Sequence, residues 1–139
     1  MTTMQNNNTN DTTPRDSADA VEATVDTYLA TWNETDAAKR ATLIGASLAA
    51  DLWYRDPMLE ADGLEAYDGM IAAVQAQMPG LVMTRTSPID AHRDLVRFNW
   101  ALGAPGADPV FAGVDVAKYD ADGKLHRIIG FAGETIAAA

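Results

Sequence analysis

The sequence contains no cysteine, and this absence excludes several kinds of site. The 139 residues can form no disulfide, no thiolate metal site and no cysteine nucleophile. No stretch of about 18 apolar residues could span a membrane, and the N-terminus lacks a basic segment followed by an apolar one. We therefore expect a soluble, cytoplasmic protein.

Basic residues are also scarce, with 10 Lys and Arg against 20 Asp and Glu and a net charge of −10. Nucleic acids and anionic membranes repel an acidic surface, so we expect neither as a partner. The two histidines, His92 and His126, have no metal-ligand spacing with the carboxylates, which indicates no metal site. No segment indicates a cofactor site either, and we expect none.

The chain divides into a polar N-terminal segment and one domain. Residues 1–17 are rich in Asn and Thr and nearly lack large apolar side chains. Such a segment buries too little surface to offset the entropy of ordering, so we expect a disordered tail. Residues 18–139 are enough for one domain with its own core.

Helical patterns occupy the first half of this domain. Apolar residues at helical spacing predict a first helix from Ala18 that turns Tyr28 inward. Residues 33–36 break this helix and cap a second one. A third helix is predicted to begin at Gly63 and to end before Pro79.

Strand patterns dominate the second half. A short strand is predicted before Pro57, and residues 81–88 and 94–102 predict two more strands. Residues 110–134 predict a hairpin, because two apolar runs flank the turn residues 120–123. Helices first and strands last indicate an α+β fold, in which a curved antiparallel sheet wraps around the N-terminal helices as a cone with one apolar pocket.

A carboxylate interrupts the apolar pattern of the hairpin. Asp115 lies between Val114 and Val116, on the strand face that it shares with Phe111 and Tyr119, since side chains alternate along a strand. Burial of an unpaired carboxylate costs several kcal/mol or raises its pKa. Asp115 is therefore a candidate functional residue. The opposite face is also apolar, so we expect a second subunit to cover it in a homodimer.

The order of elements and three local patterns resemble the nuclear transport factor 2-like superfamily. The patterns are Arg55-Asp56-Pro57 at a strand end, Gly113-Val114-Asp115 within a strand, and Tyr119-Asp120-Ala121-Asp122-Gly123-Lys124-Leu125 followed by Ile129-Gly130-Phe131. Within the superfamily the likeness is to the SnoaL-like group, which includes polyketide cyclases and ketosteroid isomerases. The likeness covers about residues 18–134 and implies the cone-shaped fold.

The likeness to ketosteroid isomerases implies roles for three residues. Asp56, in an Asp-Pro pair, matches the general base. Tyr28, eight residues before Asp36, matches the oxyanion-hole tyrosine, and Asp115, five residues before Asp120, matches the second donor, a protonated aspartate. The implied reaction is proton abstraction next to a carbonyl of a small apolar molecule. We expect the pocket aromatics to be Trp32, Trp53, Phe98, Trp100, Phe111 and Phe131, and no further tyrosine to extend a hydrogen-bond network around Tyr28.

Other interpretations of the same residues stay open at this point. Tyr28 could be a core tyrosine, Asp56 could only cap a turn, and Arg97 could neutralise Asp115 in a salt bridge. The first alternative function is a non-catalytic ligand-binding or dimerising module. The second is a hydrolase that resembles limonene epoxide hydrolase, with Arg97 between Asp56 and Asp115 to position a water molecule.

Overall fold

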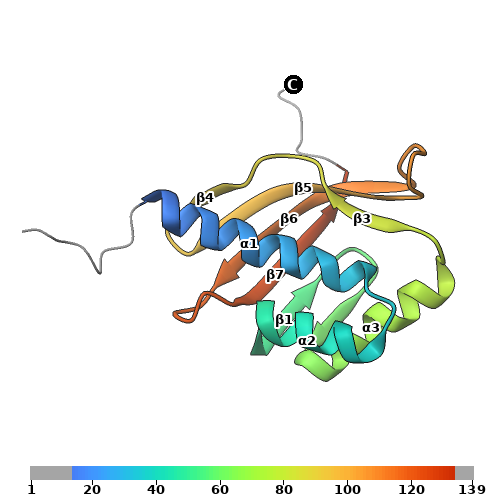
Figure 1. Ribbon diagram of the computed structural model, residues 1–139, viewed down its shortest axis with the longest axis horizontal. Helices are drawn as coiled ribbons and strands as arrows, with labels where there is room; N and C mark the ends of the chain where they lie inside the picture. The colour runs from blue at the N-terminus through green and yellow to red at the C-terminus, as the bar shows by residue number, and fades with distance from the viewer. Residues whose placement is uncertain (1–13, 134–139) are drawn as a thin grey trace, which may run out of the picture.

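The computed structural model describes residues 14–133, which form three helices and a seven-stranded sheet (Figure 1). The helices are α1 (Pro14–Asn33), α2 (Ala37–Ser47) and α3 (Leu64–Gln77). The strands are β1 (Leu48–Arg55), β2 (Glu60–Asp62), β3 (Val82–Arg85), β4 (Asp90–His92), β5 (Leu95–Gly103), β6 (Phe111–Tyr119) and β7 (Leu125–Ala132). The α+β prediction is confirmed. Within the described range, no helix has both the length and the apolar character needed to cross a membrane.

The first helix begins earlier than the sequence pattern predicts. It starts at Pro14 rather than at Ala18, so part of the predicted tail is helical. Proline is favoured in the first turn of a helix, where its missing N–H has no partner to lose. The rest of the predicted tail, residues 1–13, lies outside the described residues, as do residues 134–139.

The sheet is mixed rather than wholly antiparallel. Its strand order is β2-β1-β7-β6-β5-β3, with β4 also paired to β5, and only the β1–β7 pairing among the described strands is parallel. No hairpin joins β1 to β7, so no turn forces them to run in opposite directions. The short strands β2 and β4 were not predicted, because three residues are too few to display an alternating pattern.

Local signals set most element boundaries. The carboxylate of Asp36 accepts a hydrogen bond of 2.9 Å from the Lys39 amide and caps α2 as predicted. Gly63 precedes α3 with φ +88°, a conformation that favours glycine. In the β6–β7 turn, Asp120 Oδ1 accepts from the amides of Asp122 and Lys124. The predicted hairpin is therefore confirmed.

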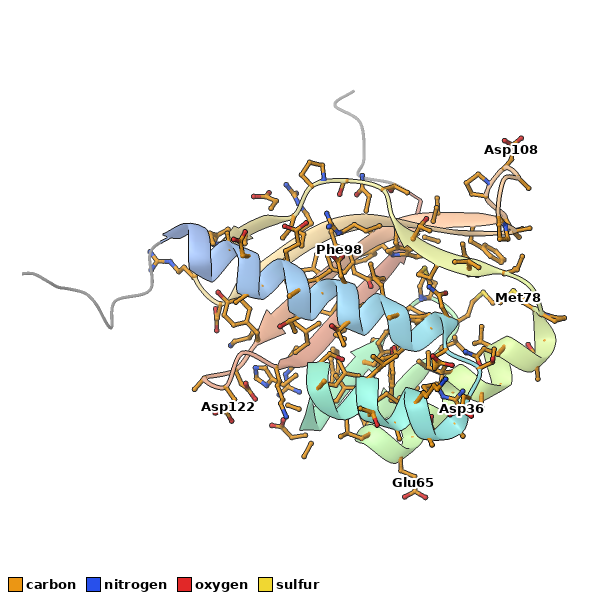
Figure 2. All side chains as sticks on the ribbon, in the orientation of Figure 1. Asp36, Glu65, Met78, Phe98, Asp108 and Asp122 are labelled. Atoms are coloured by element: carbon orange, nitrogen blue, oxygen red, sulfur yellow. The ribbon has the colours of Figure 1, made fainter. Side chains whose placement is uncertain are left out.

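The core lies between α1 and the inner face of the sheet. In Figure 1, α1 crosses in front of the sheet, while α2 and α3 gather beside β1. Figure 2 shows Phe98 behind α1, on the side of the helix that faces the strands. Tyr28, Leu29 and Val25 on α1 and Phe98 on β5 are all buried. The apolar stripe of the first helix thus covers the sheet, as its spacing predicts.

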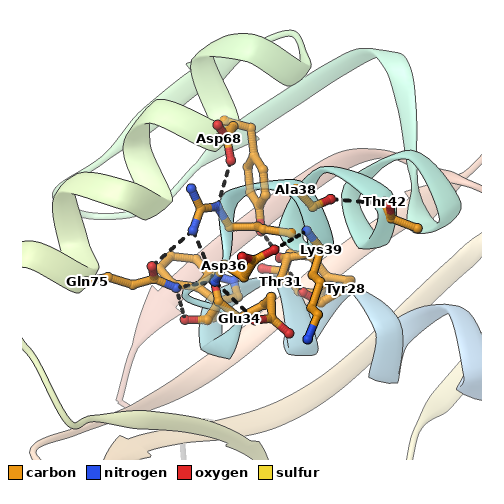
Figure 3. A network of polar contacts seen from close by, with 12 residues as sticks. Tyr28, Thr31, Glu34, Asp36, Ala38, Lys39, Thr42, Asp68 and Gln75 are labelled. Carbon is orange, nitrogen blue, oxygen red and sulfur yellow. Dashed lines mark hydrogen bonds and ion pairs between the residues drawn. The ribbon is translucent and has the colours of Figure 1, made fainter.

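A buried arginine ties the three helices together at the end of α1 (Figure 3). Arg40 Nε is 2.6 Å from Asp68 Oδ1, and its Nη1 donates to the Glu34 carbonyl and to Gln75 Oε1. The Gln75 amide in turn donates to the backbone carbonyls of Trp32 and Glu34, at 3.0 Å in each case. This network anchors the last turn of α1, and with it the position of Trp32.

Candidate functional site

A cavity of about 140 Å³ opens between α1, α3, the end of β1 and the inner face of the sheet. An engineered cavity of about 150 Å³ holds a benzene molecule, so this one is large enough for a single six-membered ring. Its apolar wall includes Met58, Leu59, Val74, Met78, Met83 and Leu102. Its ionisable groups are Tyr28, Tyr54, Asp56 and Asp115, so the structure brings the three residues implied by the family resemblance to one place.

Asp115 is a buried carboxyl group in the cavity wall. It is only 4% exposed, on the inner face of β6. The Tyr28 hydroxyl donates to Asp115 Oδ2 at 2.8 Å, and Trp100 Nε1 donates to Oδ1 at 3.0 Å. Burial raises the pKa of Asp115 from 3.8 to about 7, although these two hydrogen bonds oppose the shift and the charge of Asp56 adds to it. Asp115 therefore exchanges its proton near neutral pH.

A glycine allows Trp100 to reach this carboxyl group. Gly113 on β6 is paired with Trp100 on β5, and the indole ring lies over the glycine. A Cβ atom at Gly113 would stand 2.5 Å from Trp100 Cζ2 and 2.1 Å from the Phe131 carbonyl oxygen. Any larger residue would displace the indole or the strand, so Gly113 is needed for the hydrogen bond between Trp100 and Asp115.

Asp56 lies at the rim of the cavity and is held by three donors. Its Oδ1 accepts from the amides of Met58 and Leu59 at 2.8 and 2.7 Å. Its Oδ2 accepts from the Tyr54 hydroxyl at 2.6 Å. The expected turn-capping role is therefore real, but the same residue also lines the cavity. Hydrogen bonds to both oxygens stabilise negative charge and set the orientation of the carboxylate.

Gly130 separates the two carboxyl groups. It is paired with Asp115 across β6 and β7. A Cβ atom at this position would lie 2.8 Å from Asp115 Oδ1 and 3.2 Å from Asp56 Cβ. The two aspartates thus flank one α-carbon, and this proximity explains why the charge of Asp56 raises the pKa of Asp115.

Two further tyrosines pack near Tyr28, which the sequence did not predict, but their hydroxyls bond to Thr31 and Asp56. Tyr54 and Tyr67 are buried beside Tyr28, with ring centroids 6.5 Å apart for Tyr28–Tyr67 and 5.8 Å for Tyr54–Tyr67. Burial, followed by the charge of Asp115, raises the pKa of Tyr28 and of Tyr54 well above the usual value. A sequence signal existed for Tyr54, because it precedes Asp56 by two residues and lies on the same strand face.

Three of the six predicted pocket aromatics line the cavity: Trp32, Trp100 and Phe111. Phe98 shares the inner face with Asp115 but lies beneath Tyr28, with ring centroids 6.4 Å apart. Trp53 projects from the other face of β1, where the guanidinium groups of Arg55 and Arg127 lie 4.3 and 5.6 Å from its ring centroid.

Phe131 also fails to reach the cavity. It lies between Gly130 and Ala132 on β7, and those neighbours face inward, so alternation turns its ring to the outer face. Its side chain is 54% exposed. The sequence pattern indicates that Phe131 lies on a strand. An error of one position in the assumed register, however, moves its side chain to the opposite face of the sheet.

Arg97 plays neither of its expected roles. It is paired with Val116 on the outer side of the sheet and forms a salt bridge of 2.6 Å with Asp90. It therefore neither neutralises Asp115 nor stands between Asp56 and Asp115 to position water. Across the described part of the chain, no group of three or more histidine or acidic side chains is arranged to hold a metal ion.

Comparison with known proteins finds similar chains among solved structures. No family model matches the chain, and no curated protein does. A proposed isomerase of the SnoaL-like family from Agrobacterium tumefaciens is 31% identical, with a TM-score of 0.78. The match covers 83% of this chain and 98% of that protein.

Two more distant structures share the fold. A protein of unknown function with a cystatin-like fold from Methylobium petroleophilum is 21% identical, with a TM-score of 0.68 and coverage of 86% of this chain and 80% of the other. A proposed polyketide cyclase from Sinorhizobium meliloti is 16% identical, with a TM-score of 0.60 and coverage of 78% and 93%. At these identities the similarity supports the fold alone.

Proposed function

Because the chain belongs to the SnoaL-like family of the nuclear transport factor 2-like superfamily, we propose that it is a small-molecule enzyme of the isomerase or cyclase type. The reaction is proton abstraction next to a carbonyl group, on an apolar substrate that places about one ring in the cavity. The observation that carries the proposal is Asp115, a buried carboxyl group whose pKa of about 7 suits proton transfer at neutral pH.

The two aspartates divide the chemistry between them. Asp56 carries its negative charge at the rim, stabilised by Tyr54 and two backbone amides, and acts as the base. Asp115, whose pKa burial raises to about 7, keeps a proton closer to neutral pH than an ordinary carboxyl group and acts as the acid. A pair of carboxyl groups in unlike environments is a recurring basis for such acid–base assignments.

Stabilisation of the intermediate falls to Tyr28 and Asp115. When the substrate loses a proton, negative charge grows on its carbonyl oxygen, and nearby donors lower the energy of that state. Tyr28 donates to Asp115 Oδ2 at 2.8 Å in the free protein, so the two groups are close together, and its hydroxyl turns from Asp115 to the substrate oxygen when both act as donors. One such donor is typically worth about 3 kcal/mol of the barrier.

Deuterium exchange tests the proposal whatever product the reaction gives. The protein is incubated in D₂O with a panel of one-ring ketones, including acetophenone and cyclohexenones, and exchange next to the carbonyl is followed by NMR. We expect exchange with the wild type and a loss of roughly 10²- to 10⁴-fold in Asp115→Asn and in Asp56→Asn. Asp122→Asn, at the exposed hairpin tip in Figure 2, is the matched control. Exchange that survives both cavity substitutions would refute the proposal.

A binding module without chemistry is the second candidate, favoured by one observation. All four oxygens of Asp56 and Asp115 already accept hydrogen bonds from within the protein. A pocket whose carboxyl oxygens all have hydrogen-bond donors can hold an apolar ligand without reacting with it. Saturable ketone binding with no exchange by any panel member would favour this function over the enzyme.

We also propose a homodimer in which a second copy covers the outer face of the sheet. Val114 and Val116 on β6 and Ile129 and Phe131 on β7 lie on this face, and the last two are 37% and 54% exposed. Light scattering at micromolar concentration should give twice the 14.8 kDa chain mass. Phe131→Glu should give the monomer mass, because a charge in an apolar interface is costly to bury. A monomeric wild type would contradict the proposal.

A further inference from the structure

Trp100 donates its indole N–H to one oxygen of the Asp115 carboxyl group. Its Nε1 is 3.0 Å from Oδ1, while the other oxygen, Oδ2, accepts from the Tyr28 hydroxyl at 2.8 Å. Trp100 on β5 is paired with Gly113 on β6, two residues from Asp115, so the indole reaches the carboxyl group along the diagonal between the strands. The two oxygens therefore have different neighbours, one on the sheet and one on α1.

The two donors differ in how they respond when Asp115 takes up a proton. A hydroxyl group can donate or accept, so Tyr28 can turn and receive a hydrogen bond from a protonated Oδ2. An indole N–H can only donate, so a proton on Oδ1 would leave Trp100 with the hydroxyl oxygen of the acid, which is the weaker acceptor. The hydrogen bond from Trp100 therefore favours a neutral Asp115 whose proton is on Oδ2.

Oδ1 is also closed in on the side of β7. Gly130 is paired with Asp115, and a Cβ atom at Gly130 would stand 2.8 Å from Oδ1. An oxygen with an indole on one side and a strand backbone on another has little room beside it for a substrate atom. Oδ2, next to the Tyr28 side chain in the cavity wall, is the oxygen better placed to act on a substrate.

We infer that Trp100 is a positioning residue of the site: its N–H holds Oδ1 and thereby places the proton of neutral Asp115 on Oδ2, beside Tyr28. With that proton in place Oδ2 donates rather than accepts, so the Tyr28 hydroxyl is free to turn its own proton to a substrate oxygen. The use of the proton in catalysis rests on the proposed function. Its place on Oδ2, in contrast, is a property of the protein without a substrate.

The titratable groups that interact with Asp115 come from all the elements packed against it. They are Tyr28 on α1, Tyr54 on β1, Tyr67 on α3 and Asp56 after β1. Burial raises the pKa of each of the three tyrosines, so all three stay neutral between pH 5 and pH 8. A change at Trp100 near pH 7 that is absent from Asp115→Asn therefore reports the ionisation of Asp115.

The indole proton of Trp100 tests the place of the acid proton in the full chain. The ¹⁵N-labelled protein has three tryptophans, whose indole signals are assigned with Trp32→Phe, Trp53→Phe and Trp100→Phe. Asp115→Asn mimics the acid with its proton on Oδ2, because its oxygen has to face the indole donor, and Asp115→Ala has no acceptor. We expect the wild-type Trp100 signal at pH 5.5 to agree with that of Asp115→Asn, and to move further downfield near pH 7. Agreement with Asp115→Ala at pH 5.5 would overturn the inference.

Replacement of Trp100 by 3-benzothienylalanine gives a second readout that does not depend on those variants. It removes only the donor, because a sulfur atom takes the place of the N–H in a ring of the same shape. The N–H stabilises charged Asp115, so we expect the titration midpoint of the Asp115 ¹³C carboxyl signal to rise by about one unit. The same replacement of Trp53, on the outer side of β1, should leave the midpoint unchanged. A loss of packing alone would not move it.

The exchange assay tests the use of the proton. At pH 5.5, where Asp115 is protonated with or without the donor, we expect the maximal rate of ketone exchange to fall roughly tenfold in the protein with 3-benzothienylalanine at position 100. An unchanged midpoint, or exchange at the wild-type rate, would overturn the role of Trp100. If no ketone exchanges with the wild type, the enzyme proposal fails, and the two NMR results still decide whether Trp100 places the proton.

Discussion

One aspartate lies in the inner wall of the cavity, its floor (Asp115), and one lies at its opening, the rim (Asp56). The two are supported in different ways. At the rim, all three donors to Asp56 come from within three residues of it in the chain. At the floor, the donors to Asp115 come from Tyr28 and Trp100, 87 and 15 residues away. The rim is therefore a local structure, whereas the floor exists only when helix α1 and strands β5 and β6 are assembled.

The two kinds of support control different properties, namely the orientation of Asp56 and the ionisation of Asp115. Local donors orient Asp56 and stabilise its charge, and a short turn is enough to supply them. The pKa of Asp115 depends mainly on burial, which requires α1 to cover the sheet. A change in packing far from the cavity should therefore alter the proton affinity of Asp115 before it affects the turn around Asp56.

The largest expected effect is a pH-dependent cost of Asp115 to stability. Well below pH 3.8 the carboxyl group is protonated in both the folded and the unfolded state, so it does not change the free energy of unfolding. As pH rises, the unfolded group ionises while the folded group keeps its proton until about pH 7, so the free energy of unfolding falls. The loss is about 4 kcal/mol by pH 8 and constant above that.

Urea denaturation of wild type and Asp115→Asn from pH 4 to pH 8 measures this cost. The asparagine variant does not ionise, so it should gain about 4 kcal/mol relative to the wild type over that range. It should therefore become the relatively more stable protein at high pH while losing deuterium exchange. Parallel stability curves for the two proteins would mean that Asp115 titrates normally.

Gly130→Ala should disturb the floor and the rim together. The added Cβ would stand 2.8 Å from Asp115 Oδ1 and 3.2 Å from Asp56 Cβ, so one carboxyl group has to move. We expect a loss of about 2 kcal/mol in the free energy of unfolding. Gly69→Ala, in α3 with nothing within 4 Å of its new Cβ, is the matched control and should stabilise by about 0.5–1 kcal/mol. Equal effects at the two sites would contradict the crowding at Gly130.

Two substitutions of Asp56 should distinguish its role in the turn from its charge. Asp56→Ala removes the acceptor of the Met58 and Leu59 amides and should cost about 1–2 kcal/mol. Asp56→Asn keeps an oxygen for both amides and should cost less than about 0.5 kcal/mol while still abolishing exchange. Thermal unfolding and the exchange assay, applied to both variants, measure the two roles separately. An asparagine variant that still exchanges would remove Asp56 as the base.

Tyr54→Phe is expected to have a smaller effect on stability than Asp56→Ala. It removes the 2.6 Å hydrogen bond to Asp56 Oδ2 but leaves both amide donors in place. We expect a loss of about 1 kcal/mol in stability, measured by urea denaturation. Tyr119→Phe, which removes a hydroxyl bound to the Arg93 carbonyl, is the control with an uncharged acceptor and should lose less. A larger loss for Tyr119→Phe would argue against a charged Asp56.

The sequence predicted the helices, the hairpin and the inward face of Asp115, because each depends on residues close together in the chain. It did not predict the hydrogen bond between Trp100 and Asp115, which requires the pairing of Gly113 with Trp100 across two strands. It placed Phe131 and Trp53 in the pocket wrongly, because composition does not reveal which face of a strand a ring occupies.

By itself, the sequence determined that a carboxylate would lie in mid-strand among apolar residues and that another would end a strand before a proline. Only the tertiary structure decided that both meet at Gly130 and that Arg97 stays on the far side of the sheet. The physical reason is that alternation and capping act over a few residues. Burial, strand register and the field of a neighbouring charge act between residues that only folding brings together.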